Sequence, residues 1–167
     1  LLMVSAVGNN VSCFSGNDGD ATASVSGGTS PFSYLWSNGA STDDLQGAPA
    51  GTYSIIITDA NGCTSADTIV ISEPSALSAS ATSADASCNS GNDGTASVIV
   101  SGGISPYNYL WSNGAGTDNL PGVSAGTYSV TVTDVNLCQG LLSYSFNEPV
   151  PLLFLSSSQT NILCNGD

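Results

Sequence analysis

Residues 27–40 read GGTSPFSYLWSNGA, and residues 102–115 read GGISPYNYLWSNGA, which is the same pattern 75 positions later. The agreement extends outward from this segment at the same offset: Cys13 with Cys88, residues 50–54 with 125–129, Cys63 with Cys138, and Pro74 with Pro149. Self-similarity at a fixed period indicates a tandem-repeat protein. We therefore predict domains at residues 1–74 and 75–150, with residues 151–167 opening a third, incomplete repeat.

Within each unit, apolar and polar residues alternate with a period of two, which is typical of strands with one buried face. Tyr53, Ile55 and Ile57, for example, alternate with Ser54 and Thr58. Gly-Gly, Asn-Gly and proline separate such runs at intervals of roughly 8–15 residues. The pattern predicts an all-β fold in which each unit of about 75 residues is a small antiparallel β-sandwich of about six or seven strands.

The charge composition excludes many functions. The 167 residues include 13 carboxylates but no lysine, arginine or histidine, so the formal net charge is −13. Nucleic-acid backbones are gripped by cationic side chains, and histidine-dependent nucleophiles need an imidazole, so neither kind of site is expected. Paired-carboxylate catalysis is the enzyme class left, but no acid pair recurs in both units beside a plausible cleft. We expect a protein that is not an enzyme.

The repeated motifs resemble a known family. Cys…Asn-Asp-Gly is followed by Gly-Gly-x-x-Pro-(Phe/Tyr)-x-Tyr-x-Trp-Ser-x-Gly, then Ala-Gly-Thr-Tyr, then Thr-Asp-x-Asn-x-Cys. This order is similar to the SprB repeat, found in tandem in large Bacteroidota cell-surface adhesins with immunoglobulin- or PKD-like modules. The resemblance implies an extracellular, cell-surface location and a role in adhesion or stalk extension. One departure, Gly62 to Leu137, puts a tight Asn-Gly turn in doubt for the second unit.

Five cysteines in a chain of secreted character favour disulfides. We expect one bond to close each unit, with Cys164 bonded outside this chain: Cys13–Cys63 and Cys88–Cys138. In the alternative, bonds join neighbouring units: Cys63–Cys88 and Cys138–Cys164. The Cys63–Cys88 bond needs the chain to fold back as a hairpin at Glu73-Pro74, the joint between the two units. Otherwise 25 extended residues at about 3.3 Å each would hold the two sulfurs far apart.

Several polar residues are candidates for ligands or modification. Five acids are weak candidates for calcium ligands: Asp18, Asp20, Asp59, Asp93 and Asp134. Asp and Asn also form turns by accepting local backbone N–H bonds, so we expect no cofactor, with calcium as the alternative. Thr68 follows Asp67 in the Asp-(Ser/Thr)-apolar pattern that the resemblance makes a candidate for O-glycosylation, and Asn10 fits an N-glycosylation acceptor.

The aromatic residues are expected in the sandwich core: Trp36, Tyr53, Trp111 and Tyr128. An exposed sugar-stacking platform, and hence a carbohydrate-binding module, is the alternative for the tryptophans. No stretch of 18 apolar residues occurs, so we expect no direct membrane insertion. The expected partners are neighbouring repeats or copies of the chain joined end to end, and surface glycans under the alternative.

The C-terminal segment 151–163 is too apolar for a free tail, since an exposed apolar strand invites pairing with another chain. We expect it to be ordered and to pack against strands that it does not itself supply. Those strands belong to the continuing polypeptide or, in a self-polymerising filament, to a neighbouring copy by strand exchange.

Overall fold

The computed structural model describes residues 1–153, and the expected strand of a third repeat falls mainly on residues 154–167, outside them. Twelve strands and no helix make up the described part. The strands of repeat 1, residues 1–74, are β1 (Met3–Asn9), β2 (Gly19–Ser26), β3 (Ser33–Trp36), β4 (Asp44–Ala48), β5 (Gly51–Thr58) and β6 (Thr64–Ile71). Those of repeat 2, residues 75–150, are β7 (Ser78–Ala84), β8 (Gly94–Ser101), β9 (Asn108–Trp111), β10 (Asn119–Val123), β11 (Gly126–Thr133) and β12 (Gln139–Phe146).

Each repeat is a sandwich of two three-stranded sheets. In repeat 1 the strand orders are β1-β2-β4 and β3-β5-β6, and in repeat 2 they are β7-β8-β10 and β9-β11-β12. Every strand pair is antiparallel. The predicted all-β fold of tandem antiparallel sandwiches is therefore confirmed.

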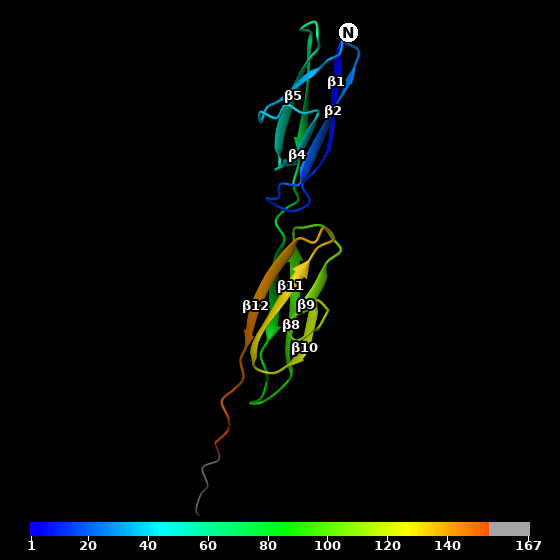
Figure 1. Cartoon of the computed structure of the whole chain (residues 1–167). Coiled ribbons are helices and arrows are strands. Elements are labelled where there is room, and N and C mark those ends of the chain that lie inside the picture. Colours follow the sequence, from blue (N-terminus) through cyan, green and yellow to red (C-terminus); the bar gives the residue numbers. More distant parts are fainter. Residues whose placement is uncertain (154–167) are drawn as a thin grey trace, which may run out of the picture.

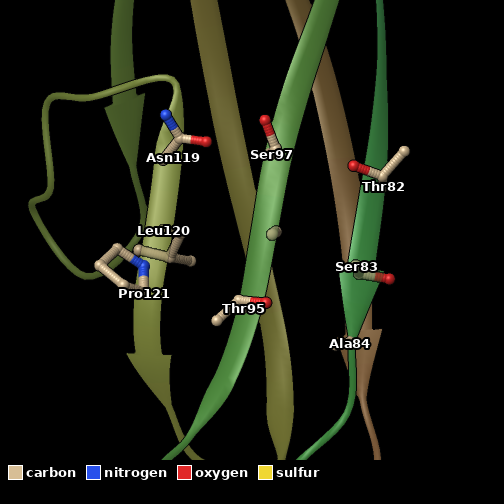
Figure 2. Close-up of a pocket in the computed structure, with 9 residues that line it drawn as sticks. Thr82, Ser83, Ala84, Thr95, Ser97, Asn119, Leu120 and Pro121 are labelled. Atoms are coloured by element: carbon tan, nitrogen blue, oxygen red, sulfur yellow. The ribbon is translucent and has the colours of Figure 1, made fainter.

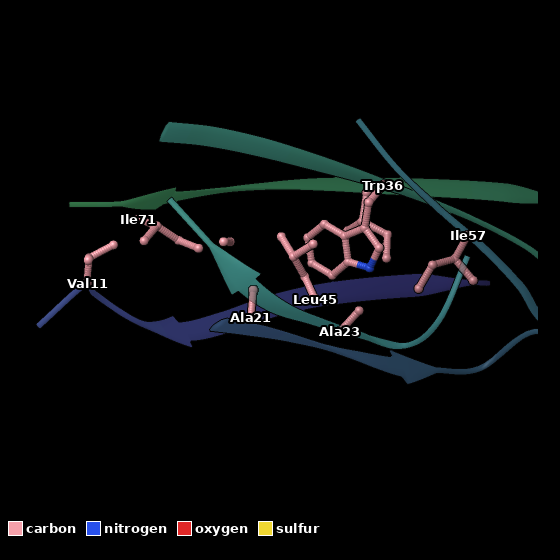
Figure 3. Close-up of a cluster of buried hydrophobic side chains, with 9 residues drawn as sticks. Val11, Ala21, Ala23, Trp36, Leu45, Ile57 and Ile71 are labelled. Atoms are coloured by element: carbon pink, nitrogen blue, oxygen red, sulfur yellow. The ribbon is translucent and has the colours of Figure 1, made fainter. Parts of the chain in front are cut away.

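The core lies between the two sheets because alternate residues of each strand point inward. In repeat 1 the cluster draws on both sheets, as Figure 3 shows: Val11, Ala21, Ala23, Trp36, Leu45, Ala48, Ile55, Ile57 and Ile71. In repeat 2 it comprises Ala96, Val98, Trp111, Leu120, Val123, Val130, Val132 and Phe146. Trp36 and Trp111 are 1% and 2% exposed, so neither indole can serve as a sugar platform. Tyr53 and Tyr128 are packed against these clusters.

In each sandwich the chain passes once from one end to the other in two short strands, one in each sheet. β3 pairs with β5 from Ser33↔Thr58 to Trp36↔Ile55, and β4 continues in the same direction but in the other sheet, ending at Ala48↔Gly19. The switch occurs in the loop after Trp36, whose indole Nε1 donates a hydrogen bond of 3.0 Å to the Thr42 carbonyl. The chain thus enters β5 at the end of the sandwich where β2 began.

The two sandwiches lie end to end (Figure 1). The N-terminus is at the outer end of repeat 1, and the chain leaves repeat 2 at the opposite extreme. Only Ser72 to Leu77 separates β6 from β7, so the loops at the inner end of repeat 1 face those of repeat 2. This junction is where the cysteines meet.

Candidate functional site

The junction between the repeats is closed by a disulfide. Cys13 is bonded to Cys138, with a Cα–Cα distance of 5.7 Å and a sequence separation of 125 residues. The expected pairs Cys13–Cys63 and Cys88–Cys138 are wrong, and so is the alternative Cys63–Cys88. Cys63 and Cys88 are exposed thiols, while Cys164 lies outside the described residues.

The physical reason is that the two cysteines of one repeat lie at opposite ends of its sandwich. Val11, beside the Cys13 loop, donates its N–H to the Ser72 carbonyl at the end of β6. Cys63 precedes the first residue of β6, so the eight-residue strand, about 26 Å long, separates the two cysteines. A disulfide needs Cα atoms within about 7 Å, which only the facing repeat offers.

The loop that presents Cys13 is held by its own repeat. Gly16 donates its N–H to the Cys13 carbonyl at 3.0 Å, and Ser15 has a left-handed φ of 56°. Asp18 Oδ1 accepts the Ser12 N–H at 3.0 Å, and Glu73 Oε2 accepts the Ser15 N–H at 2.6 Å. Glu73 therefore ties the cysteine loop to the Glu-Pro joint.

The turn that presents Cys138 is organised by a buried carboxylate. Asp134 is 0% exposed and accepts three backbone N–H groups, from Ile104, Asn136 and Cys138, each at 2.9 Å. These bonds satisfy the charge in a site that offers no cation. Leu137 takes the left-handed φ of 68° that this turn requires, so the Asn-Gly turn of repeat 1 persists in repeat 2 despite the loss of glycine.

Contacts beside the disulfide add to the junction. The Asn136 side chain donates from Nδ2 to the Ser12 carbonyl at 2.9 Å. A shallow hollow beside the sulfurs is lined by Cys13, Phe14, Ala76, Leu77, Cys138 and Gln139. Ser12, Glu73 and Asn136 escaped the sequence reasoning. Their signal was available, because Ser12, Ser87, Glu73, Glu148, Asn61 and Asn136 recur at equivalent positions.

Four of the five calcium candidates accept local backbone N–H bonds in loops or turns, and the fifth, Asp20, lies within β2. Asp59 accepts N–H groups from Thr29, Asn61 and Cys63, the counterparts of the Asp134 bonds. The backbone bond from Cys63 is the main cause that lowers the pKa of Asp59 below its usual value. Asp18 and Asp93 accept bonds from Ser12 and Ser87, and Asp20 accepts bonds from Asn9. No cluster of three or more potential metal-binding side chains occurs in the described part of the chain.

The glycosylation candidates are both exposed on the surface of repeat 1. Thr68 lies on β6 and donates its N–H to Oδ1 of Asp67, the acid of the Asp-(Ser/Thr)-apolar motif, at 2.8 Å. The Asn10 Oδ1 accepts the Ser72 N–H at 2.8 Å, so this amide is engaged in joining β1 to the end of β6.

A hollow on the outer face of one sheet recurs in both repeats. In repeat 2 it lies over β7, β8 and β10 and is lined by small side chains, including Thr82, Thr95, Ser97, Asn119 and Pro121 (Figure 2). In repeat 1 the equivalent hollow includes Asp20 and Asp44 where repeat 2 has Thr95 and Asn119. Neither hollow is lined by an aromatic ring.

Comparison with known proteins identifies the repeated segment. A family model described as the SprB repeat matches residues 5–41 and again residues 80–116. Each sandwich contains a segment that matches the SprB repeat model. In each copy the matched SprB segment runs from the first strand, through the cysteine loop and the Gly-Gly turn, to the tryptophan where the chain changes sheets. The resemblance noted from the motifs is therefore confirmed.

Several solved structures are similar to this chain. A C-terminal 282-residue fragment of intimin, in complex with the intimin-binding domain of the translocated intimin receptor, has a TM-score of 0.44 and 13% identity, over 86% of this chain and 62% of that one. A Dscam structure has a TM-score of 0.38 and 11% identity, over 87% of this chain and 47% of that one. The amphioxus IgVJ-C2 molecule has a TM-score of 0.35 and 11% identity, over 86% and 96%. At these scores the similarity carries no information on function.

This chain thus spans less than two thirds of the intimin and Dscam chains. No curated protein is similar enough to register as a relative. Residues 1–153 contain no helix long and apolar enough to cross a membrane.

Proposed function

We propose that the chain is a segment of a long extracellular surface protein, in which SprB-type sandwiches joined end to end act as a structural, non-catalytic stalk. The observation that carries this proposal is the disulfide between Cys13 of one repeat and Cys138 of the next. A bond across a junction restricts how two domains rotate and separate, which a spacer requires and a pair of independent binding modules does not.

Other features of the junction support the same role. The connection from β6 to β7 is short and contains Pro74, whose ring restricts the backbone. The Asn136 hydrogen bond to Ser12 and the Glu73 hydrogen bond to Ser15 hold the facing loops in place. Each repeat therefore contacts its neighbour through a small preformed surface, as in other repeat arrays.

Surface chemistry supports an exposed location. A net charge of −13 without any cation keeps such chains apart from one another and from anionic lipid surfaces. The absence of lysine and arginine also removes every trypsin cleavage site, which suits a protein exposed to proteases.

Small-angle X-ray scattering of the oxidised chain tests the stalk. We expect the profile of two rigid sandwiches placed end to end. A Cys13→Ser/Cys138→Ser variant should remain folded but show a broader distribution of dimensions, because the domains then bend about the joint. A Cys63→Ser/Cys88→Ser variant is the matched control and should keep the rigid profile. A compact oxidised particle with its sandwiches side by side would refute the proposal.

A further inference from the structure

The two exposed thiols occupy the same positions as the two bonded sulfurs. Cys63 is equivalent to Cys138, and Cys88 is equivalent to Cys13, at the common offset of 75 residues. Each lies at the end of its sandwich away from the junction: Cys63 in the turn between β5 and β6 of repeat 1, and Cys88 in the loop between β7 and β8 of repeat 2.

The outer turn around Cys63 already has the geometry of the bonded turn. Asp59 accepts the Asn61 and Cys63 N–H groups at 2.9 Å each, the same distances at which Asp134 accepts those of Asn136 and Cys138. The exception is the Asn61 side chain. Its Nδ2 donates to Thr29 Oγ1 at 2.9 Å, whereas Asn136 reaches across the junction to the neighbouring repeat.

The outer loop around Cys88 likewise copies the bonded loop. Gly91 donates to the Cys88 carbonyl at 2.9 Å, Ser90 has a φ of 57°, and Glu148 accepts the Ser90 N–H at 2.7 Å. The corresponding values around Cys13 are 3.0 Å, 56° and 2.6 Å. Both outer half-sites are thus formed before any partner arrives, which lowers the ordering cost of docking.

We propose that Cys63 and Cys88 each form a disulfide with a further repeat, equivalent to the Cys13–Cys138 bond between repeats 1 and 2. Cys88 bonds the Cys138-equivalent of the repeat that follows in the same polypeptide, and Cys63 bonds the Cys13-equivalent of the repeat that precedes it. The occupant is argued from sequence: after Pro149 the chain repeats the apolar lead-in and reaches Cys164-Asn165-Gly166-Asp167, the opening of another cysteine loop. This inference rests on the proposed tandem stalk.

Bonds of this kind interleave along the array. The bond from Cys13 closes at Cys138, while the bond from Cys88 begins between them and closes in the third repeat. Every repeat is then covalently tied to both neighbours, and each bond is crossed by the next. Breaking one bond loosens only its own junction, where the polypeptide still joins the two repeats.

The chemistry is a two-electron oxidation of two thiols. A thiolate attacks a small disulfide such as oxidised glutathione and releases one glutathione thiolate. The second cysteine thiolate then attacks the mixed disulfide and releases the other. The protein gains one disulfide, and glutathione disulfide is reduced to two glutathione molecules, whose thiolates take up the two protons that the cysteine thiols lose.

A three-unit chain tests the inference: residues 1–150 followed by a second copy of residues 76–150, refolded in a glutathione redox buffer. The added copy carries Ser78→Thr and Gln139→Thr at exposed positions, so that its two cysteine peptides differ in mass from those of the first copy. Digestion with chymotrypsin and non-reducing mass spectrometry should show a peptide joining Cys88 to the Cys138 of the added copy. Cys63 has no preceding repeat in this chain and should stay alkylatable, which makes it an internal control.

Two outcomes would overturn the inference: Cys88 fully alkylatable in the three-unit chain, or Cys88 joined to Cys63. A Cys88→Ser variant, changed only at an exposed loop position, should leave the added Cys138 alkylatable while Cys13 stays bonded to the first Cys138. Scattering from the same samples separates this failure from failure of the stalk. A rigid, elongated three-unit chain with Cys88 unbonded would keep the stalk and reject the interleaved bonds.

Discussion

Repeat 1 and repeat 2 differ most in the strand that closes each sandwich. In β6, Asp67 accepts the N–H of Ala6 at 2.8 Å, which joins the edge of one sheet to the edge of the other. Its counterpart in β12 is Leu142, and there the aromatic ring of Phe146 packs edge-on against Tyr128 and Tyr144, with centroids 5.5 and 5.2 Å apart. In repeat 1 a carboxylate joins the two sheet edges by a hydrogen bond, whereas in repeat 2 aromatic rings pack against one another.

The cores differ in a compensating way. Ile55 and Ile57 of β5 become the smaller Val130 and Val132, while Ile71 of β6 becomes the larger Phe146. Beside the first residue of β2, Val11 and Ala48 become Ala86 and Val123, an exchange of size between two positions. Cores tolerate such changes when total volume is kept.

The ends of the repeats, by contrast, keep the same acids. Those that organise the cysteine loop and the cysteine turn occur in both: Asp18 and Asp93, Asp59 and Asp134, Glu73 and Glu148. Edge and core therefore vary while these carboxylates are kept, although side chains beside them change, as from Phe14 to Asn89. This is the pattern expected of a module whose task is to join others of its kind.

The largest expected effect is loss of either core indole. Trp36→Ala should destabilise repeat 1, and Trp111→Ala repeat 2, by about 3–5 kcal/mol each, as other large truncations in cores do. The remaining tryptophan reports on the other repeat by fluorescence during denaturant unfolding. If the intact repeat unfolds at an unchanged denaturant concentration, the two sandwiches are independent. A shared shift would show that the junction couples them.

Loss of the Asp134 carboxylate comes next. Asp134→Ala leaves three backbone N–H groups without an acceptor in a buried turn and should cost about 3 kcal/mol in repeat 2. Urea unfolding monitored by Trp111 fluorescence measures the loss. Asp134→Asn keeps the size and one acceptor and should cost less. Equal losses would show that shape, not hydrogen bonding, holds the turn.

A smaller effect is expected from the exchanged core pair. Val11→Ala and Ala48→Val should each destabilise repeat 1, the first by leaving a cavity and the second by overpacking. Made together they reproduce the arrangement of repeat 2, so the double variant should be more stable than the sum of the singles by at least about 0.5 kcal/mol. Strict additivity in the thermal unfolding free energies would mean that the two positions do not share space.

The tight turn after the fifth strand of each sandwich has glycine in repeat 1 and leucine in repeat 2, and we expect this difference to change folding stability by roughly 0.5–1 kcal/mol. Leu137 is an exposed residue held in a left-handed conformation, so Leu137→Gly should stabilise repeat 2 by this amount. Gly62→Leu is the matched reverse change and should destabilise repeat 1 by a similar amount. Opposite signs in the two melting temperatures are required. If both changes destabilised, the leucine side chain would be making a contact of its own.

The smallest difference concerns pH. Hydrogen bonds lower the pKa of Asp18, Asp59 and Asp67 in repeat 1 and of Asp93 in repeat 2. A carboxyl whose pKa is lower in the folded state stabilises above its unfolded pKa, near 4, and loses that contribution as pH falls. Asp67 has no carboxyl counterpart in repeat 2, where Leu142 occupies the equivalent position, so repeat 1 should lose more stability than repeat 2 between pH 5 and 2.

Single-tryptophan variants, Trp111→Phe to follow repeat 1 and Trp36→Phe to follow repeat 2, resolve the two acid transitions by fluorescence. Between pH 6 and 8 both should be flat, because no histidine is present. Adding Asp67→Asn should shift the acid response of repeat 1 toward that of repeat 2. An unchanged response would mean that Asp67 contributes nothing to the acid sensitivity.

Repetition and alternation predicted the fold, because inward residues such as Ile55 and Ile57 are fixed by the pleat of a strand. The disulfide could not be predicted in the same way. Four strands separate Cys13 from Cys63, and four alternating reversals would return the chain to the end where it started. However, β3 and β4 are two halves of one crossing, so the chain makes three crossings and Cys63 lies at the far end.

The direction change that decides this lies in the loop after Trp36, and no local pattern distinguishes a loop that reverses from one that steps between sheets. The same limit explains why Asn136 was missed. Its partner, the Ser12 carbonyl, belongs to the other repeat, 124 positions away in sequence. The sequence of a single repeat shows neither the change of sheet after Trp36 nor the partner of Asn136.

The disulfide also defines how the molecule carries tension. When the chain is pulled from residues before Cys13 and after Cys138, force passes directly from one sulfur to the other, and residues 14–137 bear none of it. Only β1 and β12 lie on the loaded path, so they can peel away while the remaining ten strands stay unstressed. The bypassed segment, 124 residues at about 3.5 Å each, would otherwise release roughly 430 Å of slack. Reducing agents would turn this short, stiff tether into a long extensible one.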